Sequence, residues 1–136
     1  MDIPSQTLKG KRILIVEDDS ALRGMFVQLF KSRGLDVHEE MRGDRAYPRT
    51  LELRPDLILM DLNLPGMNGT EACAQVKADP RVKDAVVVMI TGDMKSVPDK
   101  IKGFALGADD YVLKPCDLAV LLARIESLLA PRKDPS

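Results

Sequence analysis

Polar side chains follow four apolar runs of this 136-residue sequence, at the point where each run ends. The runs and the polar residues behind them are 13–16 before Glu17 and Asp18, 57–60 before Asp61, 86–90 before Thr91, and 111–113 before Lys114. Carboxylates without histidine or thiolate are hard oxygen ligands that suit Mg²⁺. An ammonium and a hydroxyl can hold phosphate oxygens, and an aspartate can itself become phosphorylated. Together these groups suit phosphoryl transfer, which depends on positioning and charge neutralisation.

The first question is whether Asp61 belongs to such a site at all. Asp is common where a strand gives way to a turn, so Asp61 alone is equally well explained as a strand-end or cap residue. In an open α/β sheet, however, ligands bind outside the carboxyl ends of the strands. Four strands that each end on a polar residue therefore favour a site at that edge.

The elements between these residues must form one sheet for the side chains to meet. Continuous apolar runs are typical of parallel strands covered on both faces. A weaker run at 37–40 is half charged and is predicted to be an edge strand. Apolar residues recur with helical period over 22–30 and 118–129, and Asp19 and Asp117 stand at their predicted N-caps. The alternation predicts a doubly wound α/β domain with right-handed crossovers.

Composition limits the class of protein. Twenty Lys and Arg face twenty-one Asp and Glu, and this balance predicts no direct nucleic-acid binding and no membrane-surface role. No apolar run approaches the roughly 20 residues of a membrane span, and the start lacks a secretory h-region. Cys73 and Cys116 have no metal-like spacing and are predicted to be small buried residues in a cytoplasmic protein. We expect a flexible N-terminus over 1–10, one domain over 11–130, and a tail or linker stub over 131–136.

Four motifs, ILIVEDD, LILMDLNLPGMNG, VVVMITG and GADDYVLKP, stand in this order over about residues 11 to 130. Together they resemble the receiver domain of bacterial two-component response regulators, of the chemotaxis-regulator type. Each motif alone is weak, but four in order, each at a strand end, are specific. The resemblance implies a flavodoxin-like, five-stranded parallel sheet of order 2-1-3-4-5 with five helices.

The resemblance also implies a role for each acidic residue. Asp61 resembles the phospho-accepting aspartate, and the implied cofactor is Mg²⁺. Asp18 would ligate the metal directly, Glu17 would act through water, and Asn63 would offer its backbone carbonyl. Asp19 is expected to cap the following helix and to stay out of the metal site.

Three further positions match the family. Thr91 and Lys114 would contact the phosphoryl oxygens, and Pro115 would follow Lys114 in a cis peptide bond. Tyr111 resembles the aromatic switch residue. On phosphorylation Thr91 would move inward, and Tyr111 would turn from an outward to an inward rotamer.

The implied function is a signalling switch. A histidine kinase or phosphotransfer protein would donate the phosphoryl group, and the domain would catalyse only its own phosphorylation and dephosphorylation. The output would be a downstream effector or a second copy, bound through the face formed by helix 4, strand 5 and helix 5, about 96–130. Two alternatives stay open: a pseudo-receiver that works without phosphate, and a haloacid-dehalogenase-type phosphatase. The latter needs a second Asp where Asn63 stands.

Four further positions bear on the match to the family and on the predicted helices and strands. Gly92 stands where Ala is commoner in the family. Pro48 predicts that helix 2 begins late, near Pro48, and leaves 44–47 irregular. Pro98 fits a helix 4 that is capped by Ser96. His38 is more simply a solvated edge residue than a phosphocarrier.

Overall fold

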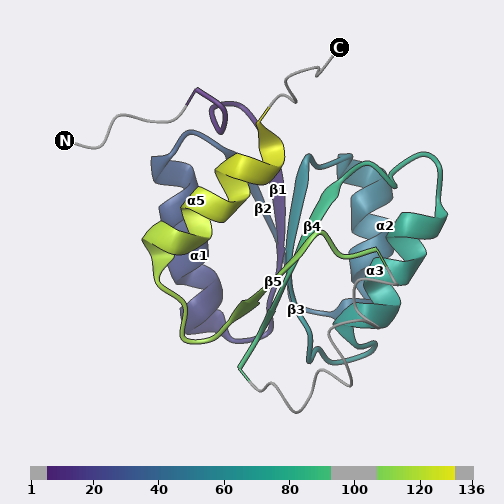
Figure 1. The fold of residues 1–136 in the computed structure, drawn as a ribbon. Coiled ribbons are helices and arrows are strands. Elements are labelled where there is room, and N and C mark those ends of the chain that lie inside the picture. Colours follow the sequence, from purple (N-terminus) through teal and green to yellow (C-terminus); the bar gives the residue numbers. More distant parts are fainter. Residues whose placement is uncertain (1–5, 93–106, 131–136) are drawn as a thin grey trace.

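The computed structural model describes residues 6–92 and 107–130, and it places five parallel strands in the order β2-β1-β3-β4-β5 (Figure 1). The elements are β1 Arg12–Val16, α1 Ser20–Ser32, β2 Asp36–Glu40, α2 Gly43–Leu53, β3 Leu57–Asp61, α3 Gly69–Ala78, β4 Val86–Thr91, β5 Asp110–Leu113 and α5 Leu118–Leu129. The predicted fold class and strand order are confirmed. The described residues contain four helices. The predicted fourth helix, with Ser96 and Pro98, lies outside the described residues.

Helices cover both faces of the sheet: α1 and α5 lie on one side, α2 and α3 on the other (Figure 1). Successive residues of a strand point to opposite faces. In β1, Ile13 and Ile15 therefore join the apolar cluster under α1 and α5, whereas Leu14 and Val16 join the cluster under α2 and α3. This two-sided burial is the reason why the strands read as continuous apolar runs. The half-charged β2 pairs with β1 at the edge of the sheet, as predicted.

The two predicted caps are confirmed. Asp19 accepts hydrogen bonds from the backbone N–H groups of Ala21 and Leu22, at 3.0 and 3.2 Å. Asp117 accepts a bond of 2.8 Å from the N–H of Ala119 at the start of α5. Each carboxylate satisfies donors that the first turn of a helix leaves without an intrahelical partner.

The predicted late start of α2 is wrong, because the helix begins at Gly43 and contains Pro48. Proline removes one backbone hydrogen bond and strains the preceding turn. Contacts with the rest of the domain stabilise that turn. The N–H of Gly43 donates to the carbonyl of Pro65 at 3.0 Å, and Ala46 is fully buried. The hydroxyl of Tyr47 donates to Asp79 Oδ2 at 2.5 Å.

The predicted flexible segment 1–10 also needs correction over 6–10, the part of it that is described. Leu8 is fully buried in the cluster under α1 and α5. Its carbonyl accepts a bond from Lys11 N–H at 3.0 Å, and Gly10 N–H donates to Gly34 at 2.9 Å. The packed part of the chain therefore begins before residue 11, where the domain was predicted to start. Residues 131–136, the predicted tail or linker stub, lie outside the described part.

Both thiols are free: Cys73 is buried, as predicted, and Cys116 is half-buried. Within the described residues, no helix combines the length and the apolarity that a membrane span needs.

Candidate functional site

The strand register brings the predicted site residues to one edge of the sheet. Val16 pairs with Met60 across β1 and β3, so Glu17 and Asp61 follow side by side. Thr91 pairs with Leu113 across β4 and β5, which brings Lys114 to the same edge. The chain direction is the same in all five strands, so their carboxyl ends lie together.

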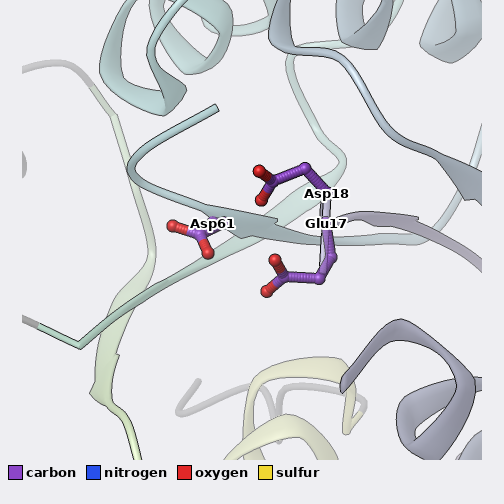
Figure 2. Close-up of side chains that lie close together, drawn as sticks. All are labelled: Glu17, Asp18 and Asp61. Carbon is purple, nitrogen blue, oxygen red and sulfur yellow. The ribbon is translucent and has the colours of Figure 1, made fainter. Parts of the chain in front are cut away.

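Three carboxylates converge at this edge. Glu17 and Asp61 are buried, at 1% and 5% exposure, whereas Asp18 is exposed. One carboxylate oxygen from each residue lies within 4.8 Å of the others. Figure 2 shows the side chains of Glu17 and Asp18 reaching from the end of β1 toward Asp61 at the end of β3. Three such oxygens repel one another unless a positive charge lies between them.

Lys114 supplies a positive charge. Its Nζ lies 2.9 Å from Glu17 Oε1 and donates to Asp61 Oδ2. Burial alone would lower the pKa of Lys114, but the hydrogen bonds to Asp61 and Glu17 outweigh burial and raise it. Lys114 therefore stays an ammonium. The Lys114–Pro115 peptide bond is cis, as predicted.

The carboxyl of Glu17 has a raised pKa. Burial raises the pKa of Glu17 to about 7, although the Lys114 ammonium and the Asp19 N–H favour its charged form. The Asp19 N–H donates to Glu17 Oε2 at 3.1 Å. The carboxylates of Asp18 and Asp61 alone outnumber the Lys114 ammonium, so the site holds an excess of negative charge even where Glu17 is protonated, and it fits a further cation. Oxygen donors alone suit Mg²⁺.

The loop after β3 contacts Asp61 through Asn63. The N–H of Asn63 donates to Asp61 Oδ1 at 2.8 Å, while Asp61 Oδ2 faces Lys114. Asn63 itself is exposed, and the N–H of Gly69 closes the loop on the carbonyl of Leu62 at 2.7 Å. Both oxygens of Asp61 are thus oriented by direct contacts.

Thr91 ends β4 and is buried, at 1% exposure. The next residue, Gly92, is exposed, and a Cβ built there would lie 3.7 Å from Lys114 Cβ. That distance is ordinary van der Waals contact, so the position has room for the Ala that is commoner in the family. The absence of a side chain leaves the approach beside Lys114 more open.

The orientation of the Tyr111 side chain differs from the one that was expected before phosphorylation. Its ring packs against the cluster under α2 and α3, and its hydroxyl oxygen is buried. Burial raises the pKa of Tyr111, and the nearby Cys73 thiol raises it further. The structure thus shows an inward-facing Tyr111, and the outward rotamer expected before phosphorylation is not the one seen.

Sequence reasoning missed two contacts around Glu17. The first is the ion pair with Lys114, which a strand-end pattern cannot assign to a particular carboxylate. The second is Arg23, whose guanidinium donates to the Glu17 carbonyl at 2.8 Å and to Glu39 at 3.0 Å. The only sequence signal for Arg23 is its place one turn beyond the Asp19 cap, which is too common to single it out.

Comparison with known proteins settles the family. Residues 13–126 match the family model of the response regulator receiver domain. The chain belongs to this family of two-component signal-transduction domains. It is 39% identical over 118 residues to the DNA-binding dual master transcriptional regulator RpaA of Synechocystis, and 40% identical over 124 residues to the DNA-binding response regulator MtrA of Mycolicibacterium smegmatis. These matches cover 87% and 91% of this chain but 48% and 53% of the relatives, so the chain spans about half the length of the curated relatives it matches.

Solved receiver domains share the fold closely. The BeF3-activated N-terminal receiver domain of Klebsiella pneumoniae RstA is 32% identical, with a TM-score of 0.80 over 88% of this chain and 99% of that one. The receiver domain of the sensor histidine kinase PA1611 from Pseudomonas aeruginosa, described with a magnesium ion in its active-site cleft, is 25% identical. Its TM-score is 0.81 over 90% of this chain and 99% of that one.

These relatives overturn one prediction. The balanced charge predicted no direct nucleic-acid binding, yet RpaA and MtrA are both described as DNA-binding regulators. The physical reason is simple: charge counted over one receiver-length segment says nothing about the half of the relatives that this chain does not match.

Proposed function

We propose that Asp61 accepts a phosphoryl group and that the domain acts as a phosphorylation-controlled switch. The observation that carries the proposal is the convergence of Glu17, Asp18 and Asp61 within 4.8 Å, with the Lys114 ammonium on Asp61. Membership of the receiver family supports the same assignment. A site with one of these groups missing would favour the pseudo-receiver alternative, but all of them are present.

Mg²⁺ fits the oxygen-donor set, with Asp18 and Asp61 as direct ligands, Glu17 acting through water and the Asn63 carbonyl as a further ligand. When bound, it would neutralise charge on the carboxylates and on the incoming phosphoryl oxygens. Its site is formed entirely from this chain, and no His or Cys ligand is needed.

The chain's own residues account for the rest of the reaction. A carboxylate oxygen of Asp61 attacks the donor phosphorus as the bond between phosphorus and the donor's imidazole nitrogen breaks, and that nitrogen keeps the electron pair. Lys114 then contacts a phosphoryl oxygen, and the Thr91 hydroxyl donates to another. Attack of water on the phosphorus then breaks its bond to the carboxylate oxygen, which releases inorganic phosphate and returns Asp61 to its carboxylate. The domain thus catalyses only its own modification and has no separate substrate to turn over.

The donor in this proposal is a histidine kinase or a phosphotransfer protein in the cytoplasm. A phosphatase of the haloacid-dehalogenase type is disfavoured, because its second aspartate would stand at Asn63. In this structure Asn63 contributes a backbone N–H to Asp61. Turnover of a small phosphate ester would revive that alternative.

Intact-mass measurement after incubation with acetyl phosphate and Mg²⁺ tests the assignment. The chain is expected to gain one phosphoryl group, and the Asp61→Asn variant should gain none because the amide is not a nucleophile. Unchanged labelling of Asp61→Asn, with the variant folded, would remove Asp61 from the mechanism.

We further propose that the output surface includes β5 and α5. Leu113 and Val120 expose large apolar side chains there, at 48% and 50%. Asp110 is joined to Arg124 by an ion pair at 3.1 Å. A downstream effector or a second copy of the chain would dock on this face. Amide chemical shifts with and without beryllofluoride should change along β5 and α5 as well as around Asp61. Changes confined to the loops at Asp61 would exclude this face.

The similarity to DNA-binding regulators supports a DNA-binding output, carried beyond these 136 residues or by a partner. Gel-shift measurements on the complete gene product, with and without beryllofluoride, test this. Phosphate-dependent DNA binding is expected. DNA affinity that is absent or insensitive to beryllofluoride would contradict it.

A further inference from the structure

We propose that the amino end of α2 positions the loop between β3 and α3, and through it the metal-binding part of the site. The inference rests on the proposed function, because that loop carries Asn63, the residue assigned a backbone ligand. The α2 residues involved act through the loop and are positioning residues. Three separate observations support this role.

The first observation is the contact of Gly43 with the loop. Its N–H donates to the carbonyl of Pro65 at 3.0 Å. A Cβ built on Gly43 would overlap the carbonyl oxygen of Met67 and would lie 3.2 Å from Leu64 Cβ. The overlap is with backbone, which cannot rotate away as a flexible side chain can. Only a residue without a side chain lets the helix start and the loop approach this closely.

The second observation is an ion pair that lies over the same loop. Arg42 Nε and Nη2 donate to the two oxygens of Asp44 at 2.9 and 3.3 Å. Gly66 has φ +85°, and a Cβ on it would overlap the Asp44 carboxylate and lie 2.7 Å from Arg42 Nη2. The loop is therefore held by the Gly43 N–H at Pro65 and covered by the ion pair at Gly66.

The third observation is that local sequence does not fix the start of α2. The N-cap residue Arg42 makes no side-chain capping bond, and Pro48 lies inside the helix. Glycine is also a poor helix former. The contacts with the loop supply the stabilisation that the local sequence does not give to the start of α2. The conformation of the helix start and that of the loop therefore depend on each other.

The loop connects these contacts to the site. Its first exposed residue, Asn63, donates its N–H to Asp61 Oδ1 at 2.8 Å. A displacement of Leu64 to Met67 would therefore move the Asn63 carbonyl and change the hydrogen bond to Asp61. Groups that orient metal ligands from outside typically change metal affinity by about 10- to 100-fold when they are mutated.

The test is Gly43→Ala, with Gly24→Ala in α1 as the matched control. A Cβ at Gly24 would meet no atom within 4 Å, so the control adds the same methyl group to a helix without touching a neighbour. In metal-free Gly43→Ala the amide shifts of residues 61–67 are expected to change, and the dissociation constant for Mg²⁺, followed by amide shifts, should rise about tenfold. Saturating Mg²⁺ should restore the rate of labelling by acetyl phosphate. Gly24→Ala should match the wild type in all three measurements.

Several results would overturn the inference. A folded Gly43→Ala variant with wild-type loop shifts and wild-type Mg²⁺ affinity would do so. A slow labelling rate that saturating Mg²⁺ does not restore would also do so. If Gly43→Ala does not fold, the double variant Arg42→Gln, Asp44→Asn removes the ion pair without adding atoms, and unchanged Mg²⁺ affinity there has the same consequence. A wild-type chain that binds no Mg²⁺ would overturn the proposed function as well, so the two failures are distinguishable.

Discussion

At the scale of single residues, neighbouring acids at the end of β1 have different surroundings. Glu17 is buried against Lys114, Asp18 is exposed beside Asp61, and Asp19 caps α1. The backbone turns between β1 and α1, so successive side chains point in different directions. Replacement of each of these residues is therefore expected to change a different property of the protein.

Asp18→Ala and Asp19→Ala form a matched pair. Asp18→Ala should weaken Mg²⁺ binding and slow labelling of Asp61 without lowering the melting temperature of the metal-free protein, because it removes one of three repelling carboxylates. Asp19→Ala should lower the free energy of unfolding by about 1 kcal/mol through loss of the cap, with Mg²⁺ affinity unchanged. Metal titration and thermal melts measure both. Equal losses of Mg²⁺ affinity would mean that the acidic residues are assigned one position out of place.

The sequence predicted which side chains would meet at the carboxyl ends of the strands, because parallel strands deliver the residues that follow them to the same edge of the sheet. It could not predict which side chains touch. The Glu17–Lys114 ion pair, the Arg23 bond to the Glu17 carbonyl and the inward-facing Tyr111 all depend on rotamers that are chosen by packing between elements distant in sequence.

At the scale of elements, strands were easier to predict than α2. The two-sided burial of β1 and β3 leaves a clear apolar signal, and β2 shows its edge position through its charges. The start of α2 has no comparable signal, since Arg42 caps nothing and Pro48 argues for a later start. Contacts with the loop after β3 and with α3 outweigh local preference there.

The contact between α2 and the end of α3 gives a test at this scale. Arg81 donates to Asp79 at 2.7 Å and the Tyr47 hydroxyl donates to it at 2.5 Å. The hydrogen bond from Arg81 holds the pKa of Asp79 well below its usual range, and the hydrogen bond from Tyr47 lowers it further. A lowered pKa in the fold means that the carboxylate stabilises the domain above the unfolded pKa of about 4, and that this contribution is lost as pH falls below it.

Tyr47→Phe and Asp79→Asn are expected to lower the melting temperature at pH 7. Below about pH 4 the unfolded chain takes up a proton at Asp79 while the folded carboxylate stays charged, so the stability that the carboxylate contributes declines and the difference for Asp79→Asn should shrink. Thermal melts from pH 7 to pH 2 measure this. A difference that stays constant over that range would show that the charge of Asp79 does not stabilise the contact.

At the scale of the whole molecule, the same parallel sheet stabilises the fold and brings the site residues together. The parallel sheet with helices on both faces buries the apolar runs, and the same strand direction brings Glu17, Asp61, Thr91 and Lys114 to one edge. The fold was predictable because four of its five strands contain apolar runs, and the charges of the fifth, β2, mark it as an edge strand. The chain spans about half the length of the curated relatives it matches, so its sequence carries no signal for the part of those relatives that it does not match.

The central claim is that Asp61 alone receives the phosphoryl group, and chemical trapping tests it most directly. Borohydride reduces an aspartyl phosphate to homoserine, which peptide sequencing by mass spectrometry can locate. After incubation with acetyl phosphate and Mg²⁺, homoserine is expected at position 61 and at no other carboxylate. Homoserine at Asp18, a reduced Glu17, or no reduced residue in a chain that binds Mg²⁺ would contradict the claim.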